Sequence, residues 1–343
     1  MPLEAQPSAS EASWLERLPK VELHLHLEGA IPLDALWELV TKYGGDPDVP
    51  SLAALADRFA YRDFPHFIQT WHWKNRFLRE YEDFAFIARR VGEDLASQDV
   101  RYAEVFFSPS DFERYGLEPQ NLAEQIRSGL DDVAGIRVAL VADLVRDTGP
   151  EQADRTLERV SEVRDCGVVG IGLGGSEHEY PAARFKEVFA KARRLGFRTS
   201  AHAGEVAGAE SVWAAAMELE ADRIGHATRA VEDPKLVDFL EARGTPLELC
   251  PISNVRTGVI PSLEAHPVRA YFDRGMLVSV NTDDPKMFGN SLADEYAALV
   301  HHHGFTREEI RELLDRTISS AWLDADERDR LRRELMADPA WRA

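Results

Sequence analysis

Histidines and carboxylates stand at the ends of several short apolar stretches, where they could bind a divalent metal ion. They occur as His24 and His26 in "KVELHLHLEG" (20–29), His202 and Glu205 in "SAHAGE" (200–205), His226 in "RIGHAT" (223–228), and Asp283 and Asp284 in "NTDDP" (281–285). Imidazole and carboxylate suit a zinc-like ion at a catalytic site that keeps one open position. Such an ion lowers the pKa of a bound water and supplies hydroxide at neutral pH. These residues therefore indicate metal-assisted hydrolysis.

Taken singly, each motif has an ordinary structural explanation. A strand with H-x-H often carries two outward polar histidines, His202 could be a hydrogen-bonded core histidine, and Asp284 before Pro285 is typical of a turn. Taken together, they all fall at the same end of their predicted strands. We expect His24, His26, His202 and Asp283 to supply three nitrogens and one oxygen to the ion. Glu205 is then free to carry a proton, and His226 and Asp284 can orient nucleophile and substrate.

The elements that must position these groups are eight short β-rich stretches that alternate with amphipathic helical segments. The strands are expected at 21–27, 100–107, 136–145, 167–175, 197–204, 223–228, 245–250 and 276–283. This alternation predicts an α/β fold, a TIM (β/α)8 barrel forming a single domain over 1–343, with a doubly wound sheet as the alternative. Strand side chains alternate between interior and helix layer. Leu23, Leu25 and Leu27 are thus predicted to face the helices, and His24 and His26 the interior.

Three segments lie outside the regular alternation. The long connection after the first strand contains a predicted helical lid insertion at 45–80, and its aromatic-rich part, 57–81, could pack on the barrel or cover a substrate. Residues 305–343 are predicted to be additional C-terminal helices, and residues 1–13 to be flexible. "HHH" (301–303) is interpreted as a partly exposed helix end.

The amino-acid composition limits the kinds of partner that the chain can bind. The 343 residues carry a formal net charge of −20, which disfavours a nucleic-acid polymer or an anionic membrane surface as partner. The N-terminus lacks a signal-peptide pattern, and no apolar stretch approaches the roughly 20 residues that span a bilayer. Cys166 and Cys250 are expected to be buried free thiols in a reducing cytoplasm. We predict a cytoplasmic protein with a small-molecule substrate, and the sequence predicts no oligomeric state.

Several motifs resemble those of the adenosine/adenine deaminase family of metal-dependent amidohydrolases. They are "KVELHLHLEGAI", "SAHAGE", "RIGHAT", "ELCPISN" (248–254) and "VNTDDP" (280–285), and they run in the family's order. The resemblance implies a TIM barrel, one Zn²⁺ per chain, and hydrolytic removal of the 6-amino group of a purine. It also implies that His24, His26, His202 and Asp283 bind the zinc.

The resemblance implies roles for the remaining residues as well. Glu205 would protonate the ring nitrogen beside the attacked carbon, and His226 with Asp283 would hold and activate the water. Asp284 would contact the imidazole edge of the purine. Gly175, in "GIGLGGSE" (170–177), would present its backbone N–H to N3 of the ring.

The substrate is less defined than the reaction. Where animal-type adenosine deaminases have "HLDG", with an Asp that contacts ribose, this chain has "HLEG" with Glu28, and the acids of the family's "DLAGDE" are replaced at Gly172 and Ser176. The first expectation is conversion of adenosine or deoxyadenosine to inosine and ammonia. Deamination of adenine, or of a 5′-modified adenine nucleoside such as aminodeoxyfutalosine, is the alternative.

Other functions fit the sequence less well. "GIGLGG" satisfies the dinucleotide pattern G-x-G-x-x-G, but "SEHEYP" follows it where a helix should begin. A two-metal amidohydrolase would need a bridging Lys or acid on the fourth strand, which ends in glycines. A non-catalytic barrel that binds purine or metal is the remaining alternative, and Glu205, a proton carrier outside the ligand set, argues against it.

Overall fold

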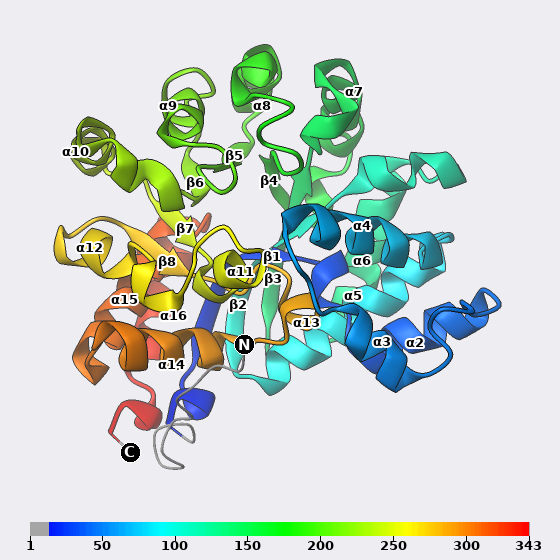
Figure 1. The fold of residues 1–343 in the computed structure, drawn as a ribbon, viewed down its shortest axis with the longest axis horizontal. Coiled ribbons are helices and arrows are strands. Elements are labelled where there is room, and N and C mark those ends of the chain that lie inside the picture. Colours follow the sequence, from blue (N-terminus) through cyan, green and yellow to red (C-terminus); the bar gives the residue numbers. More distant parts are fainter. Residues whose placement is uncertain (1–13, 343) are drawn as a thin grey trace.

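Eight parallel strands form one sheet in chain order from β1 to β8, surrounded by helices (Figure 1). The structure is a computed structural model and describes residues 14–342, so the prediction for 1–13 lies outside the described residues. The strands are β1 Lys20–His26, β2 Val100–Phe107, β3 Arg137–Asp143, β4 Val168–Gly172, β5 Arg198–Ala203, β6 Arg223–His226, β7 Leu247–Leu249 and β8 Val278–Val280. This order confirms the predicted TIM barrel and excludes the doubly wound alternative.

The barrel approaches closure where the segment after β8 meets β1. Leu25 and Asp283 form a parallel bridge. The His26 N–H donates to the Asp283 carbonyl at 2.8 Å, and the Asp283 N–H donates to the His24 carbonyl at 3.1 Å. Because these hydrogen bonds join the carboxyl ends of the first and last strands, residues about 260 positions apart lie side by side.

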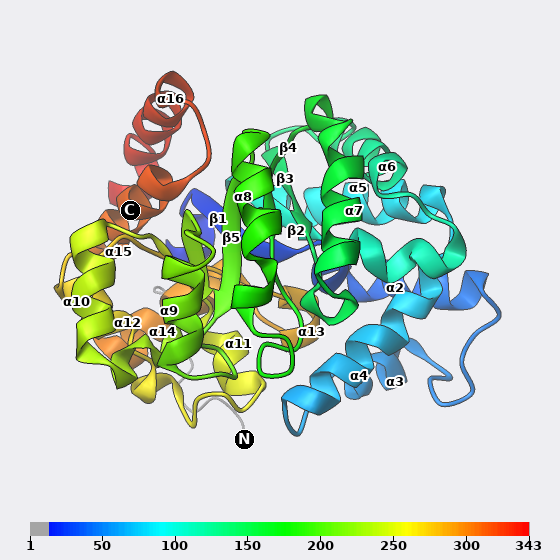
Figure 2. The ribbon, with the colours of Figure 1, turned by 90° about the horizontal axis from the view of Figure 1, so that it is seen from above.

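The helices cover the outside of the sheet and both of its ends (Figures 1 and 2). They are α2 Leu33–Lys42, α3 Leu52–Arg58, α4 Phe64–Lys74, α5 Tyr81–Ser97, α6 Pro119–Asp131, α7 Pro150–Ser161, α8 Lys186–Arg194, α9 Ala209–Met217, α10 Pro234–Arg243, α11 Pro251–Arg256, α12 Val268–Asp273, α13 Pro285–Phe288, α14 Leu292–His303, α15 Arg307–Ser320 and α16 Ala325–Met336. Local chemistry sets many boundaries. For example, Pro234 opens α10 and Gly244, with φ +66°, ends it.

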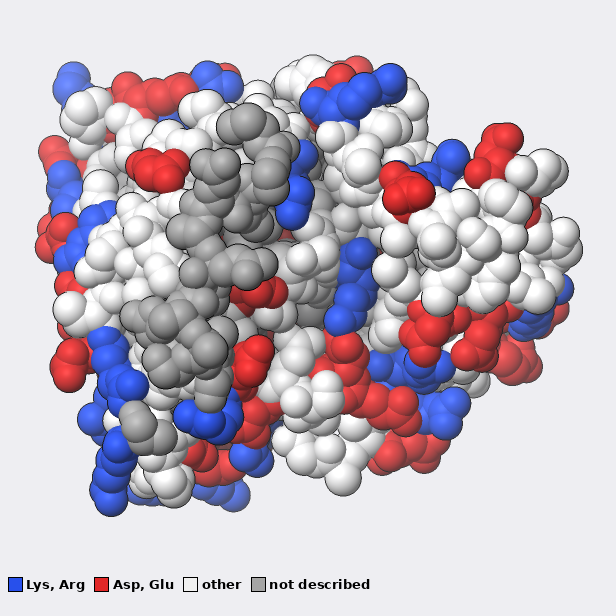
Figure 3. Space-filling view, turned by 60° about the horizontal axis from the view of Figure 1, so that its bottom comes forward, with Lys and Arg blue, Asp and Glu red and all other residues white. Residues whose placement is uncertain are grey.

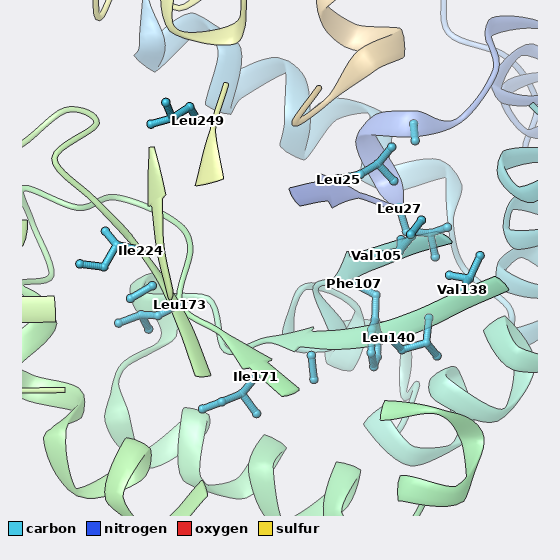
Figure 4. Close-up of a cluster of buried hydrophobic side chains, with 14 of the residues drawn as sticks. Leu25, Leu27, Val105, Phe107, Val138, Leu140, Ile171, Leu173, Ile224 and Leu249 are labelled. Atoms are coloured by element: carbon cyan, nitrogen blue, oxygen red, sulfur yellow. The ribbon is translucent and has the colours of Figure 1, made fainter. Parts of the chain in front are cut away.

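The main hydrophobic core lies between the strands and the surrounding helices. Leu25, Leu140, Ile171 and Leu249 are among the strand side chains that point outward into it (Figure 4). Each is fully buried. Removing such a side chain from water stabilises a fold by about 1.5–3 kcal/mol. This layer holds the strand ends, and hence the polar groups on them, at fixed positions.

A register shift in β1 breaks the predicted side-chain alternation. The pairing of β1 with β2 shifts between Glu22 and Leu25. Leu25 and Leu27 pack under the helices as predicted, whereas Leu23 packs with Tyr102 in a second cluster that includes residues of α15. The prediction for Leu23 was therefore wrong, because an irregular strand places successive side chains on the same side.

Two helical segments lie at opposite ends of the barrel, α4 at one and α16 at the other (Figure 2). Helix α4 lies within the predicted insertion, and Asp63 caps it by accepting the N–H of His66. Phe64, Phe67 and Trp71 repeat at helical spacing, which gives α4 one apolar face. Helices α15 and α16 agree with the predicted C-terminal helices.

The remaining predictions concern surface and thiols. Acidic and basic side chains are interspersed over the face in Figure 3. Among the described residues, no helix combines the length and apolar character needed to cross a membrane.

Both cysteines are free, but only Cys250 is buried, and Cys166 is partly exposed. The prediction of burial for Cys166 was wrong because it lies in a short 3-10 turn, Arg164–Cys166, without buried residues.

Candidate metal and substrate site

Three imidazoles and one carboxylate converge where β1, β5 and β8 end. His202 Nε2 lies 3.1 Å from His24 Nε2 and 3.1 Å from His26 Nε2. Asp283 Oδ1 lies 3.6 Å from His24 Nε2 and 3.4 Å from His26 Nε2. The residues that were predicted to be ligands thus meet around one point, although they come from distant parts of the chain.

These distances fit a single zinc ion. Zn–N bonds of about 2.0–2.1 Å in a tetrahedron place neighbouring ligand atoms about 3.4 Å apart. Burial lowers the pKa of His26 to about 3 and holds that of His202 well below its ordinary value, so both imidazoles are neutral and keep a lone pair for a metal. Ligand atoms of His24, His202, His226 and Asp283 also lie within 4.8 Å of one another, which puts His226 at the edge of the same cluster.

A chain of buried ionic contacts orients His24. Its Nδ1 donates to Glu248 Oε2 at 2.8 Å, which leaves Nε2 to face the cluster. Glu248 Oε1 lies 2.5 Å from Arg223 Nε, and Arg223 also pairs with Glu104. The Arg223 guanidinium stacks on Trp322, 3.6 Å from the ring centroid. The segment after α15 therefore connects, through side chains across the barrel interior, to a candidate ligand.

Two residues of the cluster have strained backbones. His226 has φ +59° and Asp283 has φ +65°, values that side-chain-bearing residues seldom adopt. Neighbouring side chains hold both: Ser253 donates to Asp283 Oδ2 at 2.6 Å, and Asn254 Nδ2 lies 3.1 Å from His226 Nδ1. With Asn254 donating, His226 Nε2 turns towards Glu205, whose Oε2 is 3.7 Å away.

Glu205 is buried beside the cluster, and a second glutamate holds its loop. Burial, with contributions from Asp283 and Glu177, raises the pKa of Glu205 well above its ordinary value, which favours the protonated side chain. The carboxylate of Glu177 accepts the backbone N–H groups of Gly204, Glu205, Val206 and Ala207 at 2.6–3.1 Å. Four hydrogen bonds to one buried carboxylate fix the backbone that carries Glu205.

The cluster forms the floor of a cavity of about 640 Å³ that opens to solvent. His26, His202, Glu205, His226, Asp283 and Asp284 line one side, and α4 lines another with Phe64, Phe67, Ile68, Trp71 and His72. A cavity with a few polar groups among apolar walls is typical of a small-molecule site. Part of the aromatic insertion therefore lines the cavity, although His66 does not.

At two positions beside the cavity, only a residue without a side chain fits. Gly175 lines it with φ +99°, and a Cβ there would lie 2.0 Å from Asp147 Oδ2. A Cβ on Gly29 would lie 1.7 Å from Asp284 Oδ1. Asp284 is buried, and its Oδ1 has no hydrogen-bond partner within the described part of the chain. This oxygen is available to a ligand.

Glu28 does not line the cavity. Its side chain is 1% exposed, and Oε1 accepts the Ser108 N–H at 3.0 Å. Burial raises the pKa of Glu28 to about 7, against the opposing effect of Lys74. Lys74 is itself buried, with its ammonium over the Trp71 ring and donating to Asn75 Oδ1 at 2.7 Å. Lys74 thus lies against Trp71, and neither Lys74 nor Glu28 lines the cavity.

Sequence reasoning gave no role to several residues that support this site. Glu248, Arg223 and Glu104 carry the ionic chain, and Glu177 holds the Glu205 loop. One signal was available for the first three, because each is a charged residue within a short strand. Glu177 lies in a loop and gave no comparable signal.

Comparisons with known proteins agree with this geometry. The family model "Adenosine deaminase" matches residues 19–338. The chain is 34% identical to the aminodeoxyfutalosine deaminase of Streptomyces avermitilis over 97% of this chain and 94% of that protein. It is 34% identical to the adenine deaminase of Bordetella avium over 90% of this chain and 98% of that protein.

Solved structures have the same fold. A COG1816 amidohydrolase from Burkholderia ambifaria with bound Zn has a TM-score of 0.86 and 29% identity, covering 98% of each chain. Arabidopsis ADAL complexed with GMP has a TM-score of 0.86 and 25% identity, covering 95% of this chain and 99% of that one. The chain therefore belongs to the adenosine deaminase family and is a hydrolase that acts on C–N bonds of amidines.

Proposed function

We propose that this chain, acting as a single barrel domain, is a zinc-dependent hydrolase that replaces the 6-amino group of an adenine-type purine by oxygen and releases ammonia. One observation carries the proposal: three imidazoles and a carboxylate converge on the floor of a cavity, next to the buried Glu205, whose pKa burial raises. The family match and the zinc in a structural relative support it.

His24, His26, His202 and Asp283 would hold the ion. When bound, zinc supplies a hydroxide nucleophile at neutral pH. Glu205 gives its proton to the ring nitrogen beside C6, which makes that carbon electrophilic, and the proton is available because burial disfavours the carboxylate. Water adds to C6 and gives up both of its protons, one to restore Glu205 and one to the amino group. The C6–N bond then breaks, and the amino group leaves as ammonia.

The other predicted residues bind and orient. His226, held by Asn254, and Asp283, held by Ser253, orient the attacking water. Burial raises the pKa of Asp284 well above its ordinary value, and the protonated side chain would donate a hydrogen bond to N7 on the imidazole edge of the purine. The Gly175 N–H would donate to N3. Such positioning lowers the barrier because the reacting groups meet already aligned.

The first substrate to test is adenosine or 2′-deoxyadenosine. The cavity is open to solvent and its lining extends beyond the metal end to Asp111, Asp143 and Asp147, which supports a substrate larger than a free base. Adenine and aminodeoxyfutalosine are the second candidates, because relatives at 34% identity carry those names. Glu28, which does not line the cavity, would act on the sugar side through Trp71 and Lys74.

An ammonia-release panel with zinc-loaded protein tests the proposal. The panel compares adenosine, 2′-deoxyadenosine, adenine, AMP and aminodeoxyfutalosine at one protein concentration. We expect turnover of at least one, with zinc bound at one ion per chain. Absence of ammonia from every 6-aminopurine, with zinc bound, would favour the non-catalytic purine- or metal-binding barrel.

A further inference from the structure

We propose that the wall of the cavity away from the metal cluster selects adenine nucleosides whose 5′ side is neutral or cationic and rejects those with a 5′ phosphate or carboxylate. The inference rests on the proposed function, since it describes the same cavity. It is carried by three carboxylates, Asp111, Asp143 and Asp147, that line the cavity.

The three carboxylates come from one side of the barrel mouth. Asp143 ends β3, Asp147 follows it, and Asp111 lies in the 3-10 turn after β2, Pro109–Tyr115. The metal cluster comes from β1, β5, β6 and the end of β8. The carboxylates therefore lie on the β2–β3 side of the cavity. In the proposed binding mode, the purine lies over the metal cluster and the rest of the substrate extends to this side.

Neutral groups, not cations, hold these carboxylates. Asp111 Oδ2 accepts from Trp71 Nε1 at 3.0 Å and Asn75 Nδ2 at 3.2 Å, and Asp143 Oδ1 accepts the Gly174 N–H at 2.7 Å. Asp147 accepts the N–H and the hydroxyl of Ser176 at 2.7 and 2.5 Å. Within residues 14–342, none of the three forms an ion pair with Lys or Arg. The buried Arg146 and Lys74 act on them only through longer-range electrostatic attraction, so part of the negative charge remains for a group that enters the cavity.

The nearby cations are turned away from the cavity. Arg146 is fully buried and donates to the carbonyls of Leu173, Gly174 and His202. Lys74 is fully buried and donates to Asn75. Among the described residues that line the cavity there is no Lys or Arg. A phosphate or carboxylate would therefore find no charged donor, and three like charges, at this wall.

The same wall suits hydroxyl and amine donors. Asp111 Oδ1 and Asp143 Oδ2 have no hydrogen bond within the described chain, and both residues line the cavity. Ribose hydroxyls or a 5′ ammonium can donate to these oxygens, and Trp71 and Phe67 offer aromatic faces to a cation.

Kinetics with three matched substrates test this inference: adenosine, AMP and 5′-amino-5′-deoxyadenosine at pH 8, measured as kcat/KM for ammonia release. Burial raises the pKa of Asp143 to about 6, so it is ionised at this pH. We expect AMP to be at least about 100-fold poorer than adenosine, the scale of one like-charge contact at partial burial, and the amine to equal or exceed adenosine.

Two variants assign the effect to the wall. In Asp111→Asn and Asp147→Asn, the ratio of kcat/KM for AMP to that for adenosine should rise about 10-fold. Asp165→Asn is the matched control, because Asp165 is exposed and outside the cavity, and its ratio should equal that of the parent. Added salt should reduce the difference in kcat/KM between adenosine and AMP, because it screens the repulsion between the phosphate and the carboxylates.

The outcomes separate this inference from the proposed function. A preference for any 5′-anionic adenine nucleoside, or turnover of free adenine alone, overturns the inference and leaves deamination standing. An unchanged ratio in both Asp variants also overturns it. Absence of ammonia from every 6-aminopurine overturns the proposed function itself.

Discussion

The two ends of the cavity are built from different kinds of structure. At the metal end, the side chains project from strand ends that hydrogen bonds tie together, as between His24, His26 and Asp283. At the other end, the wall comes from α4 and from loops such as the one that carries Asp147. The first end is rigid and specifies a reaction, and the second is set by loop sequence and specifies a substrate. Chemistry and specificity can therefore vary independently in this barrel.

Removing a ligand should have the largest effect at the metal end. We expect His202→Ala to lose both zinc and turnover, with kcat/KM reduced at least about 10⁴-fold, because three donors no longer complete the site.

Glu205→Gln should keep zinc and lose about 10²–10⁴-fold in kcat, since it removes only the proton. Metal analysis and ammonia release distinguish the two. Unchanged turnover in Glu205→Gln would remove Glu205 from its proposed role.

This contrast also explains how much the sequence could predict. His24, His202 and Asp283 were located because parallel strands bring their carboxyl ends to one rim, so motif and strand pattern together placed them. Leu23 was misplaced because a register shift is a tertiary feature that the alternating pattern does not contain. Glu248 could have been found, since a buried acid in "LEL" needs a partner.

The substrate end was much less predictable. The side chains of Asp111 and Asp147 lie in turns, where neither periodicity nor strand direction shows which way they point. Glu28 is buried outside the cavity, where its carboxylate accepts the Ser108 N–H and lies near Lys74, and these are contacts between segments far apart in the chain. The conformation of the loops determines such contacts. Loop conformation depends on packing between distant segments, which exists only in the folded chain.

The ionic chain beneath His24 gives a sharper test of the rigid end. We expect Glu248→Gln to weaken zinc binding about 10–100-fold, because His24 loses the acceptor that fixes its orientation. Turnover should return when zinc is in excess. Competition with a chelator measures the affinity. Glu93→Gln, at an exposed carboxylate on α5, is the control. Equal zinc affinity in both variants would exclude the orienting role.

Glu177 should have a smaller effect that changes turnover but not metal binding. In Glu177→Gln an amide group replaces one of the two acceptor oxygens that hold residues 204–207. We expect kcat to fall about 10-fold and stability by about 1–3 kcal/mol, because buried N–H groups lose their partners. Zinc content should remain at the parent value. Glu179→Gln, exposed and two residues away, should match the parent. Loss of zinc in Glu177→Gln would show a general collapse of the site instead.

The smallest expected effect concerns Asp143 and appears as a pH dependence of stability. Burial raises the pKa of Asp143 to about 6 in the folded chain, above about 3.8 in an unfolded one. The fold therefore favours the protonated acid, and the contribution of Asp143 to stability is largest below pH 4 and declines as the pH rises to about 6. The full decline is at most about 3 kcal/mol for this buried group.

Asp143→Asn removes that decline while keeping an oxygen acceptor for the Gly174 N–H. The stability of the variant relative to the parent should therefore rise between pH 4 and 6 and stay constant above. Urea unfolding of chelator-treated protein measures this without interference from zinc release, and Asp165→Asn serves as the control. A difference that stays flat from pH 4 to 7 would mean that Asp143 is ionised throughout this range. The wall would then keep its full negative charge in acid.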